Sequence, residues 1–167
     1  SGKGIKSSLL MSKASSLYRC LSKTIFSAAE LLKILNDEIC ETASRGMFVT
    51  MVIGIYDSYK KELLLANAGH EPPLIFSKGE TFSNIEEAGP PLGIAPKFKF
   101  TEKLISFTDS SMYIFTDGIT EMKDPSGDML GQEGFQDYIK KYQNVPNSQR
   151  LNKIIEELIK SGRIQKD

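Results

Sequence analysis

The sequence has few of the residues that build disulfide frameworks or transition-metal sites. Its 167 residues include two cysteines, Cys20 and Cys40, and a single histidine. Two isolated cysteines in stretches with helical patterns form neither a disulfide framework nor a zinc pattern, which favours two buried thiols in a reducing compartment. One histidine without cysteine or histidine neighbours makes a poor transition-metal site. A chain of this length buries enough surface to fold without such staples.

An excess of one charge sign is also missing, because 21 Lys and Arg residues balance 21 Asp and Glu residues. A balanced chain without a basic block gives no electrostatic case for binding nucleic acid or an anionic membrane. No apolar run approaches the ~20 residues that span a bilayer. The apolar positions from 5 to 21 alternate with Lys and Ser, unlike those of a signal peptide. We therefore expect a cytoplasmic, soluble chain that binds neither nucleic acid nor membrane, with any phosphate chemistry confined to a local site.

Hydrophobic periodicity predicts helices at both ends of the chain and strands between them. The expected helices are 5–21, one through 31–39 that a capping box at Ser27 and Glu30 begins, 135–142 and about 147–160. The expected strands are 47–56, 60–68, 73–76 and a buried strand at 112–116, with weaker candidates at 97–101 and 104–107. Helices, then antiparallel strands, then helices indicate a single α+β domain over residues 1–167.

Asp117 is the first candidate for chemistry, because it follows an apolar strand and precedes Gly118. A carboxylate at a strand end beside glycine suits a hard cation, since the glycine lets backbone and water approach closely. Asp-Gly after a strand is also the commonest tight turn, and taken alone the turn is favoured. Glu121, Asp124 and Asp128 follow, either as an extension of a metal site or as a solvated loop. Their spacing excludes an EF-hand.

Two other segments are weaker candidates. Residues 1–4, Ser-Gly-Lys-Gly, expose backbone N–H groups ahead of the first helix, which suits an anion or a metal-bound water, although their composition is typical of a flexible stub. Their spacing excludes a nucleotide P-loop. Residues 67–73 contain the only histidine, His70, as a general acid or ligand, or as part of a loop between strands that two prolines stiffen. Residues 89–93, Gly-Pro-Pro-Leu-Gly, indicate a rigid turn, with a functional loop as the alternative.

The order of these clusters is more specific than any one of them. The chain contains SGKG with SSLLM, MFVTMVIGIYD, LLLANAGHEPPLI, PPLGI and MYIFTDGITEMKDPSGDMLG, in that succession. It resembles the SpoIIE-like, RsbU-type branch of the PPM phosphatases from residue 1 to about residue 131. The resemblance implies a PP2C-like α-β-β-α sandwich, in which helices flank antiparallel sheets.

The resemblance also implies a metal-dependent serine/threonine phosphatase. Two Mn²⁺ or Mg²⁺ ions would activate a water for in-line attack on phosphoserine or phosphothreonine, with no covalent enzyme intermediate. The implied substrate is a phosphorylated STAS-domain regulator of the anti-anti-sigma type in a bacterial partner-switching pathway. The implied metal-site residues are Asp117, Asp167 and the backbone of Gly2 and Gly118, and the implied substrate or loop residues are Asn67, Gly69 and His70.

The sequence departs from the family pattern at both ends. Gly-Asp-Val usually precedes the first motif, and an Asp-Asp pair, of which Asp167 would be the first, usually precedes a last strand. We therefore expect an incomplete domain that binds the metal pair poorly and is inactive, because two cations need several carboxylates. Unpaired sheet edges predict a homodimer or swapped arrangement, and an upstream sensory domain is expected in the full chain. A non-catalytic binding module of the same fold, or an unrelated α+β domain, are the alternatives.

Overall fold

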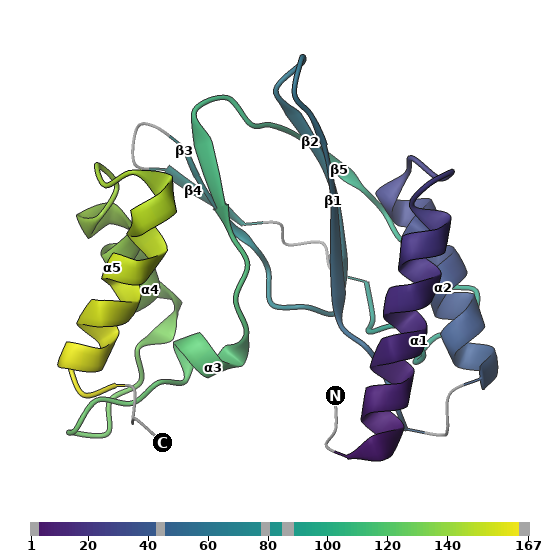
Figure 1. Cartoon of the computed structure of the whole chain (residues 1–167), viewed down its shortest axis with the longest axis horizontal. Coiled ribbons are helices and arrows are strands. Elements are labelled where there is room, and N and C mark those ends of the chain that lie inside the picture. The colour runs from purple at the N-terminus through teal and green to yellow at the C-terminus, as the bar shows by residue number, and fades with distance from the viewer. Residues whose placement is uncertain (1–3, 43–45, 78–80, 85–88, 164–167) are drawn as a thin grey trace. The chain divides into compact units, whose positions relative to one another are not determined.

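The computed structural model describes residues 4–42, 46–77, 81–84 and 89–163, and it divides into two compact units. The N-terminal unit (residues 1–114) contains α1 (Ile5–Leu21), α2 (Ala28–Thr42), β1 (Met51–Asp57), β2 (Glu62–Ala68), β3 (Leu74–Ser77), β4 (Thr81–Asn84), β5 (Lys103–Ser106) and β6 (Ser110–Tyr113). The C-terminal unit (residues 115–167) contains α3 (Asp117–Thr120), α4 (Gly131–Lys141) and α5 (Asn147–Lys160). Figure 1 labels the five helices and strands β1 to β5. The prediction of one domain over the whole chain stays a prediction.

The strands form two antiparallel sheets of three strands each, ordered β1-β2-β5 and β4-β3-β6. The predicted hairpin of β1 and β2 is confirmed, and its turn is closed by the Asp57 side chain. Asp57 Oδ1 accepts hydrogen bonds from the N–H groups of Tyr59 (2.9 Å) and Lys60 (3.0 Å). Such a local carboxylate-to-backbone turn is a common way to reverse the chain between two strands.

The helices α1 and α2 cover one face of the first sheet. Side chains alternate across a strand, so Ile53 and its cross-strand partner Ala66 point to the same face, where they are buried with the apolar stripe of α2. That stripe contains Leu31, Leu32, Leu35 and Ile39. Figure 1 shows the two helices side by side against β1 and β2. The apolar positions that predicted α2 therefore lie on the face of that helix that packs in the main core.

The opposite face of the first sheet packs on the second sheet. Leu63 and Leu65 of β2 are buried against Ile75 of β3, and Val52 and Met112 pack around them. Within the N-terminal unit the layers therefore run helices, sheet, sheet. This arrangement confirms the predicted mixture of helices with antiparallel sheets.

The predicted cap of α2 is present with an additional partner. Ser27 Oγ accepts the N–H of Glu30 at 3.1 Å, which is one of the two bonds of a capping box. A distant carboxylate then completes the cap, because Glu102 Oε2 accepts the N–H of Ala29 (2.9 Å) and the hydroxyl of Ser27 (3.0 Å). The helix start is thus tied to the segment just before β5.

Two strand predictions were wrong. Residues 97–101 form no strand: the φ of Lys97 is +59°, and its N–H donates to Asp37 Oδ1 of α2 at 2.9 Å. Because the Lys97 N–H already donates to a side chain of α2, it cannot donate to a neighbouring strand. The strand expected at 112–116 is β6, which ends at Tyr113; its residues are half-buried, and Ile114 is 54% exposed. The weaker candidate at 104–107 is confirmed by β5.

The cysteines were also misjudged in part. Cys20 is exposed and Cys40 is half-buried. Cys20 lies on α1 away from the buried positions Leu10 and Ala14, so it never enters the core. Desolvation is the main cause that raises the pKa of the Cys40 thiol.

The C-terminal unit is built on a small aromatic and aliphatic core. Phe115 packs edge to face on Phe135 of α4, with ring centroids 5.1 Å apart. Ile139 of α4 and Ile154 and Leu158 of α5 are buried. The predicted helix at about 147–160 is confirmed, and the helix predicted at 135–142 begins earlier, at residue 131. Across the described residues, no helix combines the length and apolar character needed to cross a membrane.

Candidate functional site

Asp117 lies at the start of a helix, not at the end of a strand. Residues 114–116 separate β6 from α3, and Thr116 is the N-cap in an extended conformation. The Ile119 N–H donates to the Thr116 carbonyl (2.9 Å), and the Glu121 N–H donates to the Asp117 carbonyl (2.8 Å). Asp117 and Gly118 are therefore the first two residues of a helical turn. The tight turn after a strand, which was the alternative, does not form. The sequence did not predict this helix, because an apolar run followed by Thr-Asp-Gly is typical of a strand and a turn.

The Asp117 carboxylate is exposed and uncommitted. Within the part of the chain that the structure describes, neither of its oxygens accepts a hydrogen bond or joins an ion pair; its backbone carbonyl alone is bonded, to Thr120 and Glu121. Gly118 beside it is also exposed, and an added Cβ there would meet Thr116 Oγ1 at 3.3 Å. An exposed carboxylate with free oxygens is the kind of hard ligand that Mg²⁺ and Mn²⁺ take.

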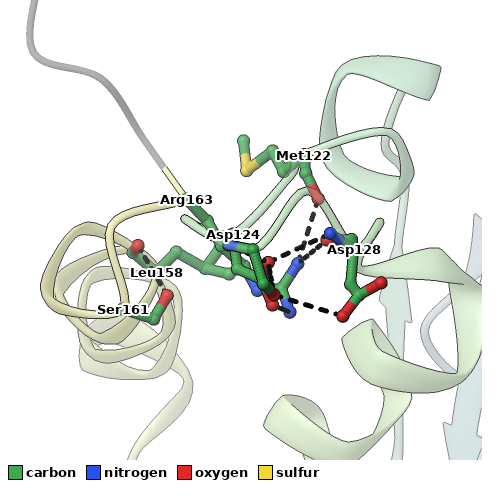
Figure 2. A network of polar contacts seen from close by, with 7 residues as sticks. Met122, Asp124, Asp128, Leu158, Ser161 and Arg163 are labelled. Atoms are coloured by element: carbon green, nitrogen blue, oxygen red, sulfur yellow. Dashed lines mark hydrogen bonds and ion pairs between the residues drawn. The ribbon is translucent and has the colours of Figure 1, made fainter.

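Both carboxylate oxygens of Asp124, by contrast, are bonded, one within its own loop and the other to Arg163. Oδ1 accepts the N–H of Ser126 (2.9 Å), the hydroxyl of Ser126 (2.5 Å) and the N–H of Asp128 (3.0 Å). Oδ2 pairs with Arg163 Nη2 at 3.1 Å, as Figure 2 shows. These contacts, the Ser126 hydroxyl first, hold the pKa of Asp124 below its ordinary value. Asp124 is thus a structural carboxylate, and it is not available to a cation.

The loop of residues 122–130 is exposed along most of its length, as expected of a solvated loop, and its backbone closes a hairpin. Lys123 and Met129 form an isolated antiparallel β-bridge. The Leu130 N–H donates to the Met122 carbonyl (2.8 Å), and the Asp124 N–H donates to the Asp128 carbonyl (3.0 Å). This closure leaves the acids of the segment in two classes. Asp124 and Asp128 are bonded within the loop, whereas Asp117 and Glu121 are exposed with side chains that have no partner among the described residues.

The Asn67–His70 segment is a turn closed by its own first side chain. Asn67 is 2% exposed, its Nδ2 donates to the His70 carbonyl (2.9 Å) and its Oδ1 accepts the His70 N–H (2.9 Å). His70 itself is half-buried, with Nδ1 3.3 Å from Thr50 Oγ1. The geometry agrees with the interpretation of a loop-shaping motif. A role of Asn67, Gly69 or His70 toward a substrate stays a prediction.

The segment around Pro91 is held against this turn and against α2. The Gly89 N–H donates to the Asn67 carbonyl (2.9 Å). The fully buried Asn36 of α2 accepts the Gly93 N–H at Oδ1 (3.1 Å) and donates from Nδ2 to the Ala95 carbonyl (2.8 Å). Sequence reasoning missed Asn36. A polar residue one position after Leu35 in the apolar stripe was the available signal.

The described residues include the type of ligand that a divalent cation takes, but too few such ligands lie together to hold one. Asp117 offers hard oxygen donors, yet no cluster of three or more His, Cys, Asp or Glu side chains able to hold a metal ion occurs within ranges 4–42, 46–77, 81–84 and 89–163. Gly2 and Asp167, the other predicted metal-site residues, lie outside the described residues. Asp117 and Gly118 belong to the C-terminal unit, whereas Asn67, Gly69 and His70 belong to the N-terminal unit. The structure therefore presents one candidate ligand and a separate ordered loop.

Comparison with known proteins decides the family. Residues 1–167 match the family model described as Stage II sporulation protein E (SpoIIE). The chain belongs to the SpoIIE family. Over 161 residues it is 29% identical to the phosphoserine phosphatase RsbU of Bacillus subtilis (strain 168), covering 95% of this chain and 48% of RsbU. Over 113 residues it is 29% identical to protein IcfG of Synechocystis, covering 66% of this chain and 18% of IcfG. This SpoIIE-family chain thus spans about half the length of RsbU and less than a fifth of IcfG.

Solved structures confirm the predicted PP2C-like fold for this SpoIIE-family chain. The SiaA-PP2C domain of Pseudomonas aeruginosa matches with a TM-score of 0.80 at 15% identity, over 97% of this chain and 66% of that domain. The RsbU and RsbW domains of Rv1364c from Mycobacterium tuberculosis match with a TM-score of 0.77 at 21% identity, over 96% of this chain and 45% of that one. The likeness at these identities is one of fold.

Proposed function

We propose that this protein is a metal-dependent phosphoprotein phosphatase in which Asp117 is a ligand of the divalent cations. The observation that carries the proposal is the free carboxylate of Asp117 in a SpoIIE-family chain. Its oxygens have no described partner, whereas the oxygens of Asp124 are held by Ser126, Asp128 and Arg163. Exposed oxygens without a protein partner can bind a cation without first breaking an ion pair.

The cofactors proposed are two Mn²⁺ or Mg²⁺ ions. When bound, they would lower the pKa of a water and neutralise charge on the phosphoryl oxygens. The chain's own contribution is to hold Asp117 on α3, with Gly118 leaving the first helical turn open to solvent. The closed loop of residues 122–130 keeps the Asp124 carboxylate bonded away from this site. Gly2 and Asp167 are proposed to complete the metal site.

The proposed substrate is phosphoserine or phosphothreonine on a STAS-domain regulator of the anti-anti-sigma type. RsbU, the relative at 29% identity, is named a phosphoserine phosphatase, and the Rv1364c structure contains an RsbU domain beside an RsbW domain. The name of RsbU supports phosphoserine as the substrate residue, and a place in the regulation of sigma factors is a further part of the proposal. Localisation in the cytoplasm and a sensory domain upstream in the full-length protein remain parts of the proposal.

The test is release of phosphate from a phosphorylated STAS-domain protein by the full-length protein. Manganese-dependent release that a chelator abolishes is the expected result. Full-length protein that binds the STAS-domain protein but releases no phosphate at any Mn²⁺ or Mg²⁺ concentration would contradict the proposed enzyme.

That contrary result is the signature of the second candidate, a non-catalytic binding module. The absence of a complete ligand cluster from the described residues is the observation that favours it. The two candidates differ in whether the full-length protein binds divalent cations at all. Calorimetric titration with Mn²⁺ alone separates them without a substrate.

A further inference from the structure

We propose that Arg163 is a positioning residue that holds the helix carrying Asp117 in place. The inference rests on the proposed metal role of Asp117 and adds a residue that lies beyond the C-terminal end of α5. Sequence reasoning gave Arg163 no role, because it follows the predicted end of a helix in an unremarkable polar stretch. Figure 2 shows its side chain reaching into the loop of residues 122–130.

The backbone at Arg163 is fixed by the way α5 ends. The Gly162 N–H donates to the Ile159 carbonyl (3.0 Å), and the Arg163 N–H donates to the Leu158 carbonyl (3.1 Å). This pair of bonds, with Gly162 at φ +73°, is a Schellman motif. A Cβ on Gly162 would come within 3.0 Å of Pro125 Cγ, so the helix end and the loop are in close contact.

The guanidinium group then joins both arms of the loop. Nη1 donates to the carbonyls of Met122 (3.1 Å) and Asp128 (2.9 Å), and Nη2 pairs with Asp124 Oδ2 (3.1 Å). The ion pair is largely shielded, since the side chains of Arg163 and Asp124 are 15% and 22% exposed. A planar fork makes such a set of bonds, whereas a lysine ammonium group presents no fork and cannot match it.

Met122 connects this group of contacts to the candidate metal ligand. Its carbonyl accepts from Arg163, while its N–H donates to the Ile119 carbonyl of α3 at 3.3 Å. The next bond back along the chain joins the Glu121 N–H to the Asp117 carbonyl at 2.8 Å. These hydrogen bonds, together with the covalent backbone of residues 119–122, therefore connect the guanidinium group to the first turn of α3. Loss of the guanidinium leaves the Leu130 N–H as the donor to the Met122 carbonyl among the described residues, and we expect the end of that turn, and with it the direction of the Asp117 carboxylate, to be held less firmly.

The experiment compares full-length wild-type protein with Arg163→Gln and Arg163→Lys. Mn²⁺ affinity is measured by calorimetry, and amide hydrogen exchange of residues 119–122 is measured without metal. We expect both variants to weaken Mn²⁺ binding by about 10- to 100-fold, the range for residues that orient ligands. Exchange at Glu121 and Met122 should be faster in both. Arg163→Lys keeps the charge and the aliphatic stem, so it separates the fork from the charge if Arg163→Gln does not fold.

The matched control is Arg150→Gln. Arg150 is buried in the C-terminal unit, and it donates to the carbonyls of Gln143 (2.8 Å) and Val145 (3.1 Å), in the segment between α4 and α5. Its loss should lower the melting temperature and leave Mn²⁺ affinity unchanged. If folded Arg163 variants bind Mn²⁺ like wild type with unchanged exchange at Glu121 and Met122, the positioning role is wrong. If wild type binds no Mn²⁺ at all, the proposed function fails instead, and the exchange data still report on the contacts.

Discussion

Gly69 lies so close to Pro91 that no side chain fits between them. A Cβ on Gly69 would be 2.5 Å from Pro91 Cγ and 2.7 Å from its backbone nitrogen, and the φ of Gly69 is +66°. The Asn67–His70 turn and the proline turn of residues 89–93 are thus two parts of one packed structure. Both motifs have a structural explanation that is independent of any catalytic role.

Gly69→Ala is therefore expected to destabilise the protein by about 2–4 kcal/mol. About 1–2 kcal/mol comes from the left-handed backbone and the remainder from overpacking against Pro91. Gly131→Ala is the matched control, because Gly131 also has φ +66° but has no atom within 4 Å of the added Cβ. Urea unfolding of both variants tests this. Equal losses at the two positions would show that Pro91 imposes no constraint.

The cap of α2 provides a second prediction, because Ser27 both accepts from Glu30 and donates to Glu102. Ser27→Ala should lower the free energy of unfolding by about 1 kcal/mol, as for other N-cap substitutions. A double-mutant cycle of Ser27→Ala with Glu102→Ala should show coupling, since the two side chains share one hydrogen bond. Ser16→Ala, at an exposed position inside α1, is the control. Strictly additive losses would contradict the shared cap.

Acid should weaken the contacts between Asp124 and Arg163. The pKa of Asp124 is lowered in the folded state, so its carboxylate contributes stability above the unfolded value of about 3.9. That contribution is lost as the pH falls through the lower, folded pKa. Asp124→Asn should therefore be less stable than wild type at pH 7, with the difference shrinking as the pH falls below about 4. Urea unfolding at a series of pH values measures this, with Asp137→Asn, at an exposed site on α4, as the control. A difference that stays constant down to pH 2 would contradict the assignment.

The 167-residue chain alone should bind Mn²⁺ poorly. Among the described residues, Asp117 is the one predicted metal ligand with a carboxylate, and a single carboxylate cannot offset the charge of two cations or complete an oxygen shell. Parallel calorimetric titrations of this chain and of the full-length protein test the point. Tight two-site binding by the 167 residues alone would contradict it.

Light scattering on the same samples tests the predicted homodimer, which a monomer at high concentration would exclude.

Local patterns predicted the elements whose stability depends on their own apolar faces. The stripe of α5, in which Ile154 and Leu158 are buried, and the hairpin of β1 and β2 were recognised because burial imposes the periods of helix and strand on the sequence. The ordered motifs likewise led to the SpoIIE family and its fold, which the comparisons confirm. Periodicity is informative where one face of an element meets the core.

Polar contacts between distant parts of the chain could not be predicted in the same way. Glu102 caps α2 from 73 residues away, and Arg163 pairs with Asp124 from 39 residues away. Neither residue type is unusual in its local sequence, since each contact exists only after the elements have packed. The segment at 97–101 failed for the same reason, because the Lys97 N–H bonds to Asp37 on a distant helix. The position of Asp117 was misjudged because four residues of helix carry too little pattern to detect.

The central claim is that Asp117 binds a divalent cation, and its most direct test is metal binding by an Asp117→Asn variant of the full-length protein. Asp137→Asn, at another exposed carboxylate of the C-terminal unit, is the matched control, and circular dichroism checks that both variants are folded. We predict that Asp117→Asn weakens Mn²⁺ binding by more than about a hundredfold, beyond the range for outer-shell residues, while Asp137→Asn binds like wild type. A folded Asp117→Asn protein with wild-type affinity for Mn²⁺ would contradict the account.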